Sequence, residues 1–359
     1  MYRLICYLVS ILLLLCEGLQ AAQYSINIVT NPTPVSLSGI NNAGQVVGSA
    51  YRSGTFLDAF YWPAPGQGQD LGTMGCAYED DDECFSKAYD INDQAITVGE
   101  GHSNFSYAYL PVAFRWENGV MAPLKTVGVE YTKSLAVNNS GTITGFGRAT
   151  YNYTYVSQAY IHFDDQQTLG LWATQPGLAS FAYGINDDNA VAGCYSPGGY
   201  DLAPGYWKDT GNRQYPFTPL PSPGAQACVE DINDQNVMVG YATNSSGARL
   251  AALWENDQFT DLGTIGVNQT YSYANAVNHA GQVVGHYRSW ERLCLPTCRT
   301  RSYLRAFIWE NGTMTALNDL VVDSGVFVKD AFDINELGQI VAMGQVNDET
   351  VFMILTPLP

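Results

Sequence analysis

Basic residues and histidine are scarce in this sequence. Its 359 residues include 16 Lys and Arg against 34 Asp and Glu, with four His, so the formal net charge at pH 7 is −18. A chain of this charge repels nucleic acid phosphates, so nucleic acid is not an expected partner. Common catalytic motifs are also missing: there is no Gly-x-Ser-x-Gly elbow, no His-Glu-x-x-His and no phosphate loop. We therefore expect no bound organic cofactor.

Long apolar runs are absent after the amino terminus. Leu4–Leu15 follows Arg3 and precedes the small residues Ala21-Ala22. A short positive start, an apolar run and small residues at its end predict a secretory signal peptide over residues 1–22. The run is too short to span a membrane comfortably, and no later stretch reaches a spanning length. We expect a secreted protein, extracellular or periplasmic, without a membrane span; lipidation at Cys16 is the alternative, although Leu14-Leu15 suits it poorly.

Helical periodicity of useful length is also absent, and a β repeat takes its place. Residues Val277–Gly285 read V-N-H-A-G-Q-V-V-G, and near-copies begin at Ile40, Ile91, Val137, Ile185, Ile232 and Ile334. The seven motif asparagines are separated by 51, 46, 48, 47, 45 and 57 residues. Seven copies at a similar period indicate a repeat architecture.

Each repeat reads as four short strands, which we name A to D. The fifth motif position is Gly or Asn in every copy except Ala95, and these residues tolerate a positive φ. A polar turn that ends at such a residue predicts an A–B hairpin, in which the motif Asn bonds nearby backbone. An A-F-x-W segment, such as Ala113–Trp116, then predicts strand C. The turn Glu117-Asn118-Gly119 follows this strand C. Strand D, which ends in Leu-Gly in other repeats, completes the unit.

The last repeat lacks a D strand, whereas Tyr24–Val29 stands alone before the first motif. If Tyr24–Val29 supplies the missing strand, the repeats form a ring and no sheet edge stays open. The sequence therefore predicts an all-β fold: one domain over residues 23–359, a seven-bladed β-propeller with four-stranded blades, closed by the N-terminal strand. An open solenoid is the alternative, although no polar capping repeat is visible. We expect the strand C tryptophans to lie in the core.

The repeats resemble the extracellular HAF-type repeat family, named for a His-Ala-Phe triplet. The I-N-x-x-G-Q-V-V-G half matches best, at Ile40–Gly48 and Val277–Gly285. The triplet itself stands as Asp58-Ala59-Phe60, Val112-Ala113-Phe114 and Arg305-Ala306-Phe307, so its His is absent. The resemblance covers nearly the whole chain after the leader. It implies an exported protein and supplies no catalytic residues.

One face of the predicted ring varies more than the other. The step from the last motif Gly to the Ala of strand C is 11 residues in repeats one, four and five, 14 in two and three, and 21 in six. The B–C and D–A loops share this face, whereas the A–B and C–D turns are expected to be short and uniform. Variable loops on a rigid scaffold usually carry binding. We therefore predict that the B–C and D–A face is the working face.

Six cysteines remain after removal of the leader, and they allow 15 pairings. The topology favours Cys76–Cys84, Cys194–Cys228 and Cys294–Cys298, in the oxidising compartment that a leader implies. A metal–thiolate site is the rival interpretation, which the absence of any Cys-x-x-Cys pair disfavours.

Two charged segments are candidate binding sites. The acidic loop Glu79-Asp80-Asp81-Asp82-Glu83 could hold calcium through oxygen ligands or could be a solvated loop, so calcium is kept as the alternative to no cofactor. The long segment His286–Arg305 combines aromatic residues with arginines, which are interface-forming types. Its candidate binding residues are Arg288, Trp290, Arg292, Arg299 and Arg301. Either it grips an anionic glycan or protein, or its arginines are paired locally.

Three function hypotheses follow. The leading one is a secreted binding or scaffold module that takes an extracellular glycan or protein on its variable face. The second is a carbohydrate-active hydrolase with carboxylates at the channel mouth, which would need two carboxylates from different blades. The third is a purely structural envelope protein. Asp90, Asp231 and Asp333 each precede an Ile-Asn motif, and this repetition predicts a structural hydrogen bond rather than an acid/base pair.

Overall fold

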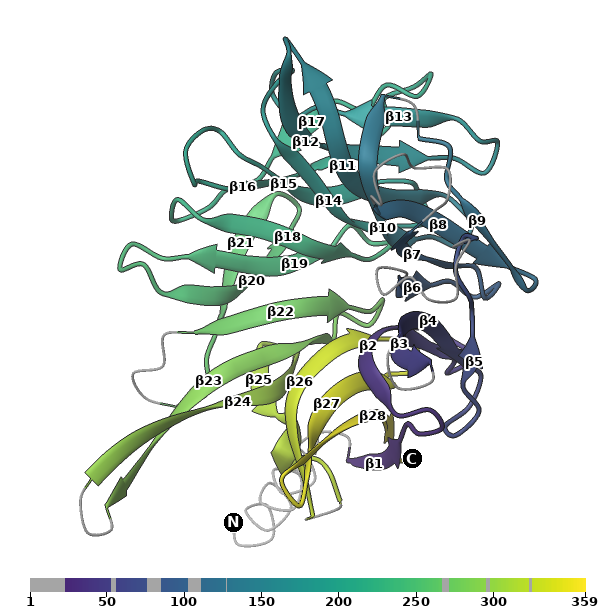
Figure 1. The fold of residues 1–359 in the computed structure, drawn as a ribbon. Coiled ribbons are helices and arrows are strands. Elements are labelled where there is room, and N and C mark those ends of the chain that lie inside the picture. Colours follow the sequence, from purple (N-terminus) through teal and green to yellow (C-terminus); the bar gives the residue numbers. More distant parts are fainter. Residues whose placement is uncertain are drawn as a thin grey trace, which may run out of the picture.

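A computed structural model describes residues 23–359 apart from 53–55, 76–84, 103–110, 127, 267–270, 295–297 and 323–324, and it leaves the side chains of 291–299 undescribed. The described chain is all-β, with one 3-10 turn at Leu317–Asp319 (η1). Its strands form seven four-stranded antiparallel sheets. Each A strand lies beside the A strand of the next sheet, and β26 lies beside β2, so the sheets close into a ring (Figure 1). The predicted seven-bladed β-propeller is confirmed.

The blades follow the chain in order. Blade 1 comprises β2 (Pro34–Ile40), β3 (Val46–Arg52), β4 (Phe56–Trp62) and β5 (Gln69–Asp70). Blade 2 comprises β6 (Ser86–Ile91), β7 (Thr97–His102), β8 (Pro111–Glu117) and β9 (Val120–Pro123). Blade 3 comprises β10 (Val129–Val137), β11 (Ile143–Tyr151), β12 (Thr154–His162) and β13 (Thr168–Leu171). Blade 4 comprises β14 (Ser180–Ile185), β15 (Val191–Tyr195), β16 (Ala203–Trp207) and β17 (Phe217–Pro219).

The remaining blades repeat this order until the last one. Blade 5 comprises β18 (Ala227–Ile232), β19 (Met238–Thr243), β20 (Arg249–Glu255) and β21 (Gln258–Gly263). Blade 6 comprises β22 (Ser272–Val277), β23 (Val283–Cys294), β24 (Cys298–Glu310) and β25 (Thr313–Ala316). Blade 7 takes β26 (Val326–Ile334), β27 (Ile340–Val346) and β28 (Glu349–Pro357) from the carboxy-terminal end and β1 (Tyr24–Ile28) from the amino-terminal end.

Strand β1 closes the ring as the sequence predicts. It pairs antiparallel with β28, from Tyr24 opposite Pro357 to Ile28 opposite Met353. Tyr24 is buried in the core between blades 6 and 7. Figure 1 shows β1 beside β28, next to the carboxy terminus. The first strand therefore covers an edge that would otherwise present unpaired backbone groups to other chains.

The A–B turns have the predicted backbone geometry. The fifth motif position has a positive φ in all seven copies, including Ala95 at 60°. In the first turn, Asn41 Oδ1 accepts the backbone N–H groups of Ala43 and Gln45. The predicted role of the motif Asn in shaping the turn is confirmed.

The hydrophobic core is divided among the blade interfaces. One cluster, for example, joins Val47 and Tyr61 of blade 1 to Ala88 and Phe114 of blade 2. Trp62, Trp207 and Trp254 of the C strands are fully buried, as expected. Burial of one large apolar side chain contributes about 1.5–3 kcal/mol. Because each interface needs two neighbouring blades, a single blade has no core of its own.

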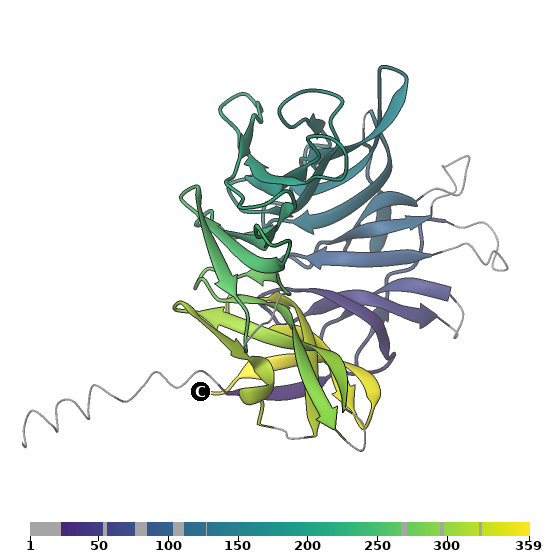
Figure 2. The same cartoon turned by 90° about the vertical axis from the view of Figure 1, so that its left-hand side faces the viewer.

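Two predictions about connections are wrong. The C–D turns are not uniform: residues 118–119 join β8 to β9, whereas residues 208–216 join β16 to β17. The added residues of repeats three and six do not form irregular B–C loops either, because β11–β12 and β23–β24 extend as long two-stranded ribbons. The β23–β24 ribbon, His286–Arg305, projects well beyond the ring (Figure 1), and Figure 2 views the molecule from the side on which it projects. Where side chains continue to alternate along both segments, pairing of the two strands satisfies more backbone N–H and C=O groups than an irregular loop does.

Candidate functional site

The seven A strands surround a central channel, and each of them contains a register irregularity at the same position. The shifts lie between Leu37 and Gly39 in blade 1, between Ala88 and Asp90 in blade 2, and at the matching position in every other blade. Such a bulge places an additional residue on one strand and re-aims its side chain. As a result, consecutive residues such as Tyr89-Asp90 and Glu230-Asp231 both line the channel.

The A–B end of the channel is formed by a closed ring of amides. Each motif Asn donates from its side chain to the backbone carbonyl of the motif Asn in the next blade. The seven bonds run from Asn41 to Asn92, Asn138, Asn186, Asn233, Asn278, Asn335 and back to Asn41, at 2.9–3.2 Å. All seven asparagines are buried. Their amides are therefore used in joining the blades.

A second ring lies at the next residue of each turn, around a cavity of 160 Å³. Its members are Asn42, Asp93, Asn139, Asp187, Asp234, His279 and Glu336. Most of them accept a backbone N–H from the preceding blade, as Asp93 does from Asn42 at 2.9 Å. His279 lies between Asp234 and Glu336, at 2.8 and 2.6 Å, and its bond to Glu336 is the main cause of its raised pKa. This cavity is polar, but its wall groups are largely committed to one another.

The carboxyl groups of three aspartates lie along the channel, next to the ring of motif asparagines. Asp90 accepts the backbone N–H of Ile91 and, across the blade interface, that of Val137. Asp231 and Asp333 make the same pair of bonds in their blades. The predicted structural hydrogen bond is confirmed. Burial is the first cause that raises the pKa of Asp90 to about 8, of Asp333 to about 7 and of Asp231 to about 6.

The channel opens toward the B–C and D–A face through a cavity of 280 Å³, which we call the upper cavity. Its wall consists of Leu37, Ser38, Tyr89, Leu135, Tyr183, Glu230, Asn275 and Phe332. Most of these residues stand two positions before the Ile or Val of the motif. A narrower cavity of 120 Å³ continues it inward to Asp90, Asp231 and Asp333. Aromatic rings, one carboxylate and one amide therefore meet at one end of the channel.

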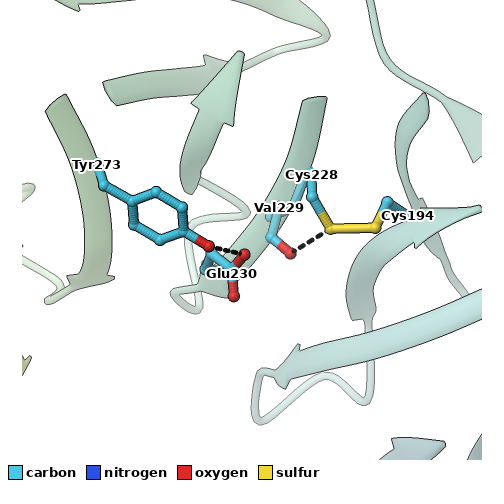
Figure 3. The surroundings of a disulfide bond; sticks show 5 residues. All are labelled: Cys194, Cys228, Val229, Glu230 and Tyr273. Atoms are coloured by element: carbon cyan, nitrogen blue, oxygen red, sulfur yellow. Dashed lines mark hydrogen bonds between the residues drawn. A yellow bond between two sulfur atoms is a disulfide. The ribbon is translucent and has the colours of Figure 1, made fainter. Parts of the chain in front are cut away.

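Two glutamates bond to tyrosines near this end. Glu230 Oε1 accepts the hydroxyl of Tyr273, which comes from the neighbouring A strand (Figure 3). Burial is the main cause of the raised pKa of Glu230, while Tyr273 and Arg249 act in the opposite direction. Glu100 Oε1 accepts the hydroxyl of Tyr89 at 2.6 Å and pairs with Lys133 at 3.2 Å. Burial, followed by Glu230, raises the pKa of Tyr273, so its hydroxyl stays protonated.

The predicted Cys194–Cys228 disulfide is confirmed. It joins β15 of blade 4 to β18 of blade 5, with the two Cα atoms 5.0 Å apart, and both residues are buried. Cys228 stands two residues before Glu230 on the same strand, and Figure 3 shows the disulfide beside the Glu230–Tyr273 pair. The bond therefore fixes the strand that carries the carboxylate of the upper cavity.

The β23–β24 ribbon does not gather its arginines on one surface. Because side chains alternate along a strand, the register places Arg288 and Trp290 on one face and Arg301, Tyr303 and Arg305 on the other. Trp290 is 48% exposed, and Arg288 stacks on Tyr271 at 5.0 Å. A groove of 600 Å³ lies between the second face and blade 7, lined by Tyr303, Arg305, Gly325, Phe327, Lys329, Gln345, Asn347 and Asp348. The register thus places Arg288 and Arg301 of the predicted site on opposite faces of the ribbon.

Other predicted site residues lie outside the described part of the structure. These are Cys76, Cys84 and the acidic residues Glu79, Asp80, Asp81, Asp82 and Glu83, together with the side chains of Arg292, Cys294, Cys298 and Arg299. In the backbone, Cys294 pairs with Cys298 at the end of the ribbon. Within the described residues, no group of three His, Cys, Asp or Glu side chains could hold a metal ion. In the same part of the chain, no helix is long and apolar enough to cross a membrane.

The residues of the upper cavity were not identified from the sequence. Tyr89, Tyr183, Glu230, Asn275 and Phe332 come from five different blades. They share one position, two residues before the motif, which holds six different residue types in the seven blades, with only Tyr occurring twice. That variation within a strict repeat is the signal that the sequence offered.

Comparisons with known proteins report fold likeness. No family model matches the sequence, and no curated protein matches it. A structure of a streptogramin B lyase aligns over 93% of this chain and 97% of its own, with a TM-score of 0.51 at 10% identity. Virginiamycin B lyase from Staphylococcus aureus aligns over 92% and 98%, with a TM-score of 0.51 at 11% identity. A Trypanosoma rangeli sialidase aligns over 93% of this chain and 55% of its own at 9% identity, with a lower TM-score of 0.39. At these identities the likeness shows a shared propeller fold alone.

Proposed function

We propose that this chain is an exported binding propeller that takes the end of an extracellular glycan chain into the upper cavity, on the B–C and D–A face. Export is supported by the signal peptide expected over residues 1–22 and by the resemblance to the HAF-type repeats. The proposal agrees with the working face expected from the variable connections.

The proposal rests on one observation: the blades share one residue type at one end of the channel and differ in residue type at the other. At the A–B end, all seven blades place the same residue, Asn, in a ring whose amides bond to one another. At the other end, the corresponding wall positions hold Ser38, Tyr89, Leu135, Tyr183, Glu230, Asn275 and Phe332. Identical residues suit a ring of equivalent hydrogen bonds, whereas recognition of an asymmetric ligand needs different ones.

The chemistry of the wall suits a sugar ring. Tyr89, Tyr183 and Phe332 provide flat apolar surfaces, while Glu230 and Asn275 provide polar groups that can fix an orientation. A volume of 280 Å³ is near the lower limit of a typical ligand site, which fits a chain end better than a whole oligosaccharide.

Glycan-array binding of the chain from Gln23 to Pro359 tests the proposal. The array should include neutral, acidic and amino oligosaccharides. We expect retention of at least one class, and Phe332→Ala should weaken it by about tenfold or more, because it removes one aromatic surface of the cavity. Asp187→Asn, at the opposite end of the channel, is the matched control and should bind like the wild type. If no class is retained, or if Phe332→Ala binds as well as the control, the proposal is wrong.

A glycoside hydrolase is the second candidate, favoured by one observation. Glu230 has a raised pKa, and Glu100 bonds to the wall residue Tyr89, so an acid in the wall and a second carboxylate behind it come from different blades. Incubation of the same oligosaccharides with the protein would produce new reducing ends that Glu230→Gln abolishes. Retention without cleavage would support binding alone.

A further inference from the structure

Among the residues that the structure describes, the wall of the upper cavity contains no positively charged group. The described wall of this cavity and of its inner continuation contains Glu230, Asp90, Asp231 and Asp333, but no Lys, Arg or His. Three cations on these strands and their neighbours have partners of their own: Lys87 lies over the Phe85 ring, Lys133 pairs with Glu100, and Arg249 stacks on Tyr241 at 4.4 Å. Arg249 lowers the pKa of Glu230 from a distance, without a hydrogen bond to it in the described structure.

Most hydrogen-bond donors of the wall are already used inside the protein. The Ser38 hydroxyl donates to the Ala88 carbonyl at 2.8 Å, and the Tyr89 hydroxyl donates to Glu100. The Asn275 side-chain N–H groups donate to Asp330 and to the Ala331 carbonyl, at 3.1 and 2.6 Å. Within the described chain, the Tyr183 hydroxyl is the remaining wall donor without a partner.

Acceptors, in contrast, are left over. Glu230 uses one carboxylate oxygen for Tyr273, and its second oxygen has no hydrogen-bond partner in the described structure (Figure 3). The side-chain oxygen of Asn275 likewise receives no hydrogen bond from a described residue. A ligand that donates hydrogen bonds therefore fits this cavity, and a positive charge on it would be favoured by the Glu230 carboxylate.

From these contacts we propose that the upper cavity binds an ammonium group, carried by the chain end that enters it. The N–H groups of the ligand bond to Glu230 and Asn275, and its charge lies among the rings of Tyr89, Tyr183 and Phe332. Aromatic faces attract cations within about 6 Å of the ring centre, so the rings and the carboxylate favour the same charge. This inference rests on the proposed function, and within that function it specifies a free amino sugar.

Calorimetric titration with three probes tests the charge separately from the ligand class. The probes are a four-unit glucosamine oligosaccharide, its fully N-acetylated counterpart and a lysine-rich peptide. We expect the glucosamine oligosaccharide to bind at least about tenfold more tightly than the N-acetylated one, a difference of roughly 1.4 kcal/mol. If the two oligosaccharides bind equally well and Phe332→Ala weakens the binding of both, the charge inference is overturned and the proposed glycan function stands. Binding of the peptide alone would support the ammonium inference and contradict the glycan function.

Glu230→Gln is the decisive variant, because Gln still accepts the Tyr273 hydroxyl while the charge is lost. It should weaken binding of the glucosamine oligosaccharide by about tenfold or more, whereas Asp187→Asn removes one charge at the opposite end and should leave binding unchanged. An equal effect of the two variants would mean that the net charge of the protein, and not this cavity, attracts the amine.

Discussion

At the residue scale, the three half-buried aspartates of the channel, Asp90, Asp231 and Asp333, have a structural role and a cost at neutral pH. Each joins two neighbouring blades through backbone N–H groups, which neutral Asn could do only in part. Burial is the largest cause of their raised pKa values, followed by repulsion from Asp333 for Asp90 and from Asp231 for Asp333. In an unfolded chain the pKa of Asp is about 3.9. The protonated form therefore favours the folded state. This contribution is complete below about pH 4 and is lost as the pH rises through the folded values of about 6 to 8.

Asp90→Asn tests this pH dependence. The variant loses one acceptor, so it should be less stable than the wild type in acid. The difference in the free energy of unfolding, variant minus wild type, should then rise with pH between about 4 and 8. Its slope should not exceed about 1.4 kcal/mol per pH unit, since one proton is involved. Urea unfolding at four pH values measures it. The control is the exposed Asp187→Asn, and equal slopes in the two variants would contradict the assignment.

The amide ring gives a second prediction at the residue scale. Asn233 accepts the N–H groups of Gln235 and Val237 and donates to the Asn278 carbonyl of the next blade. Asn233→Ala should therefore lower the free energy of unfolding by roughly 2–4 kcal/mol, because buried groups lose their partners.

Asn244 offers a matched control within the chain. It makes the same turn, accepting the N–H groups of Ser246 and Ala248, in a B–C connection at the surface. Asn244→Ala should cost only about 1 kcal/mol, and its comparison with Asn233→Ala by urea unfolding isolates the bond between blades. Equal losses would show that the ring adds nothing to the turn.

At the scale of elements, the bulged A strands convert a structural repeat into a ligand wall. In a regular strand, every second residue would line the channel, whereas at the bulge two consecutive residues line it. One of these two residues can bond to the neighbouring blade, as Asp231 does. The residue type at the other position, such as Glu230, differs between blades. The ribbon β23–β24 is the other departure from the repeat, and its alternation separates the arginines by face.

The disulfide between β15 and β18 gives a prediction at this scale. It closes a segment of 34 residues in sequence, and cross-linking a loop of this size stabilises a protein by roughly 3–4 kcal/mol. Replacement of both Cys194 and Cys228 by Ser should lower the free energy of unfolding by about that amount, measured by urea unfolding. Dithiothreitol should destabilise the wild type more than this double variant. If dithiothreitol affects both equally, Cys194–Cys228 is not the bond that it acts on.

At the scale of the whole molecule, stability depends on closure of the ring. Blade 7 is built from both ends of the chain, and its interfaces hold the first and sixth blades. No single blade buries a core alone, so loss of one strand at the closure affects every interface in turn. The channel at the centre exists only when the ring is closed.

Removal of β1 tests this closure. A chain that begins at Val29 should unfold at a lower temperature than one that begins at Gln23, and it should associate, because β28 becomes an open edge. Sedimentation velocity and thermal unfolding measure both effects. A shortened chain that stays monomeric with an unchanged unfolding temperature would contradict closure by β1.

The sequence by itself determined the repeat, the number of blades, the turn geometry, the closing strand and one disulfide. These features follow from local chemistry: positive φ at Gly and Asn, apolar alternation, and an unpaired strand at each end of the chain. Only the tertiary structure decided which residues meet in the channel. Tyr89, Tyr183, Glu230 and Phe332 lie in separate blades, and the register shift that turns them inward has no sequence signature of its own. The same reason applies to the arginines of the β23–β24 ribbon. The pairing of the two strands, and not their composition, decides on which face of the ribbon each side chain lies.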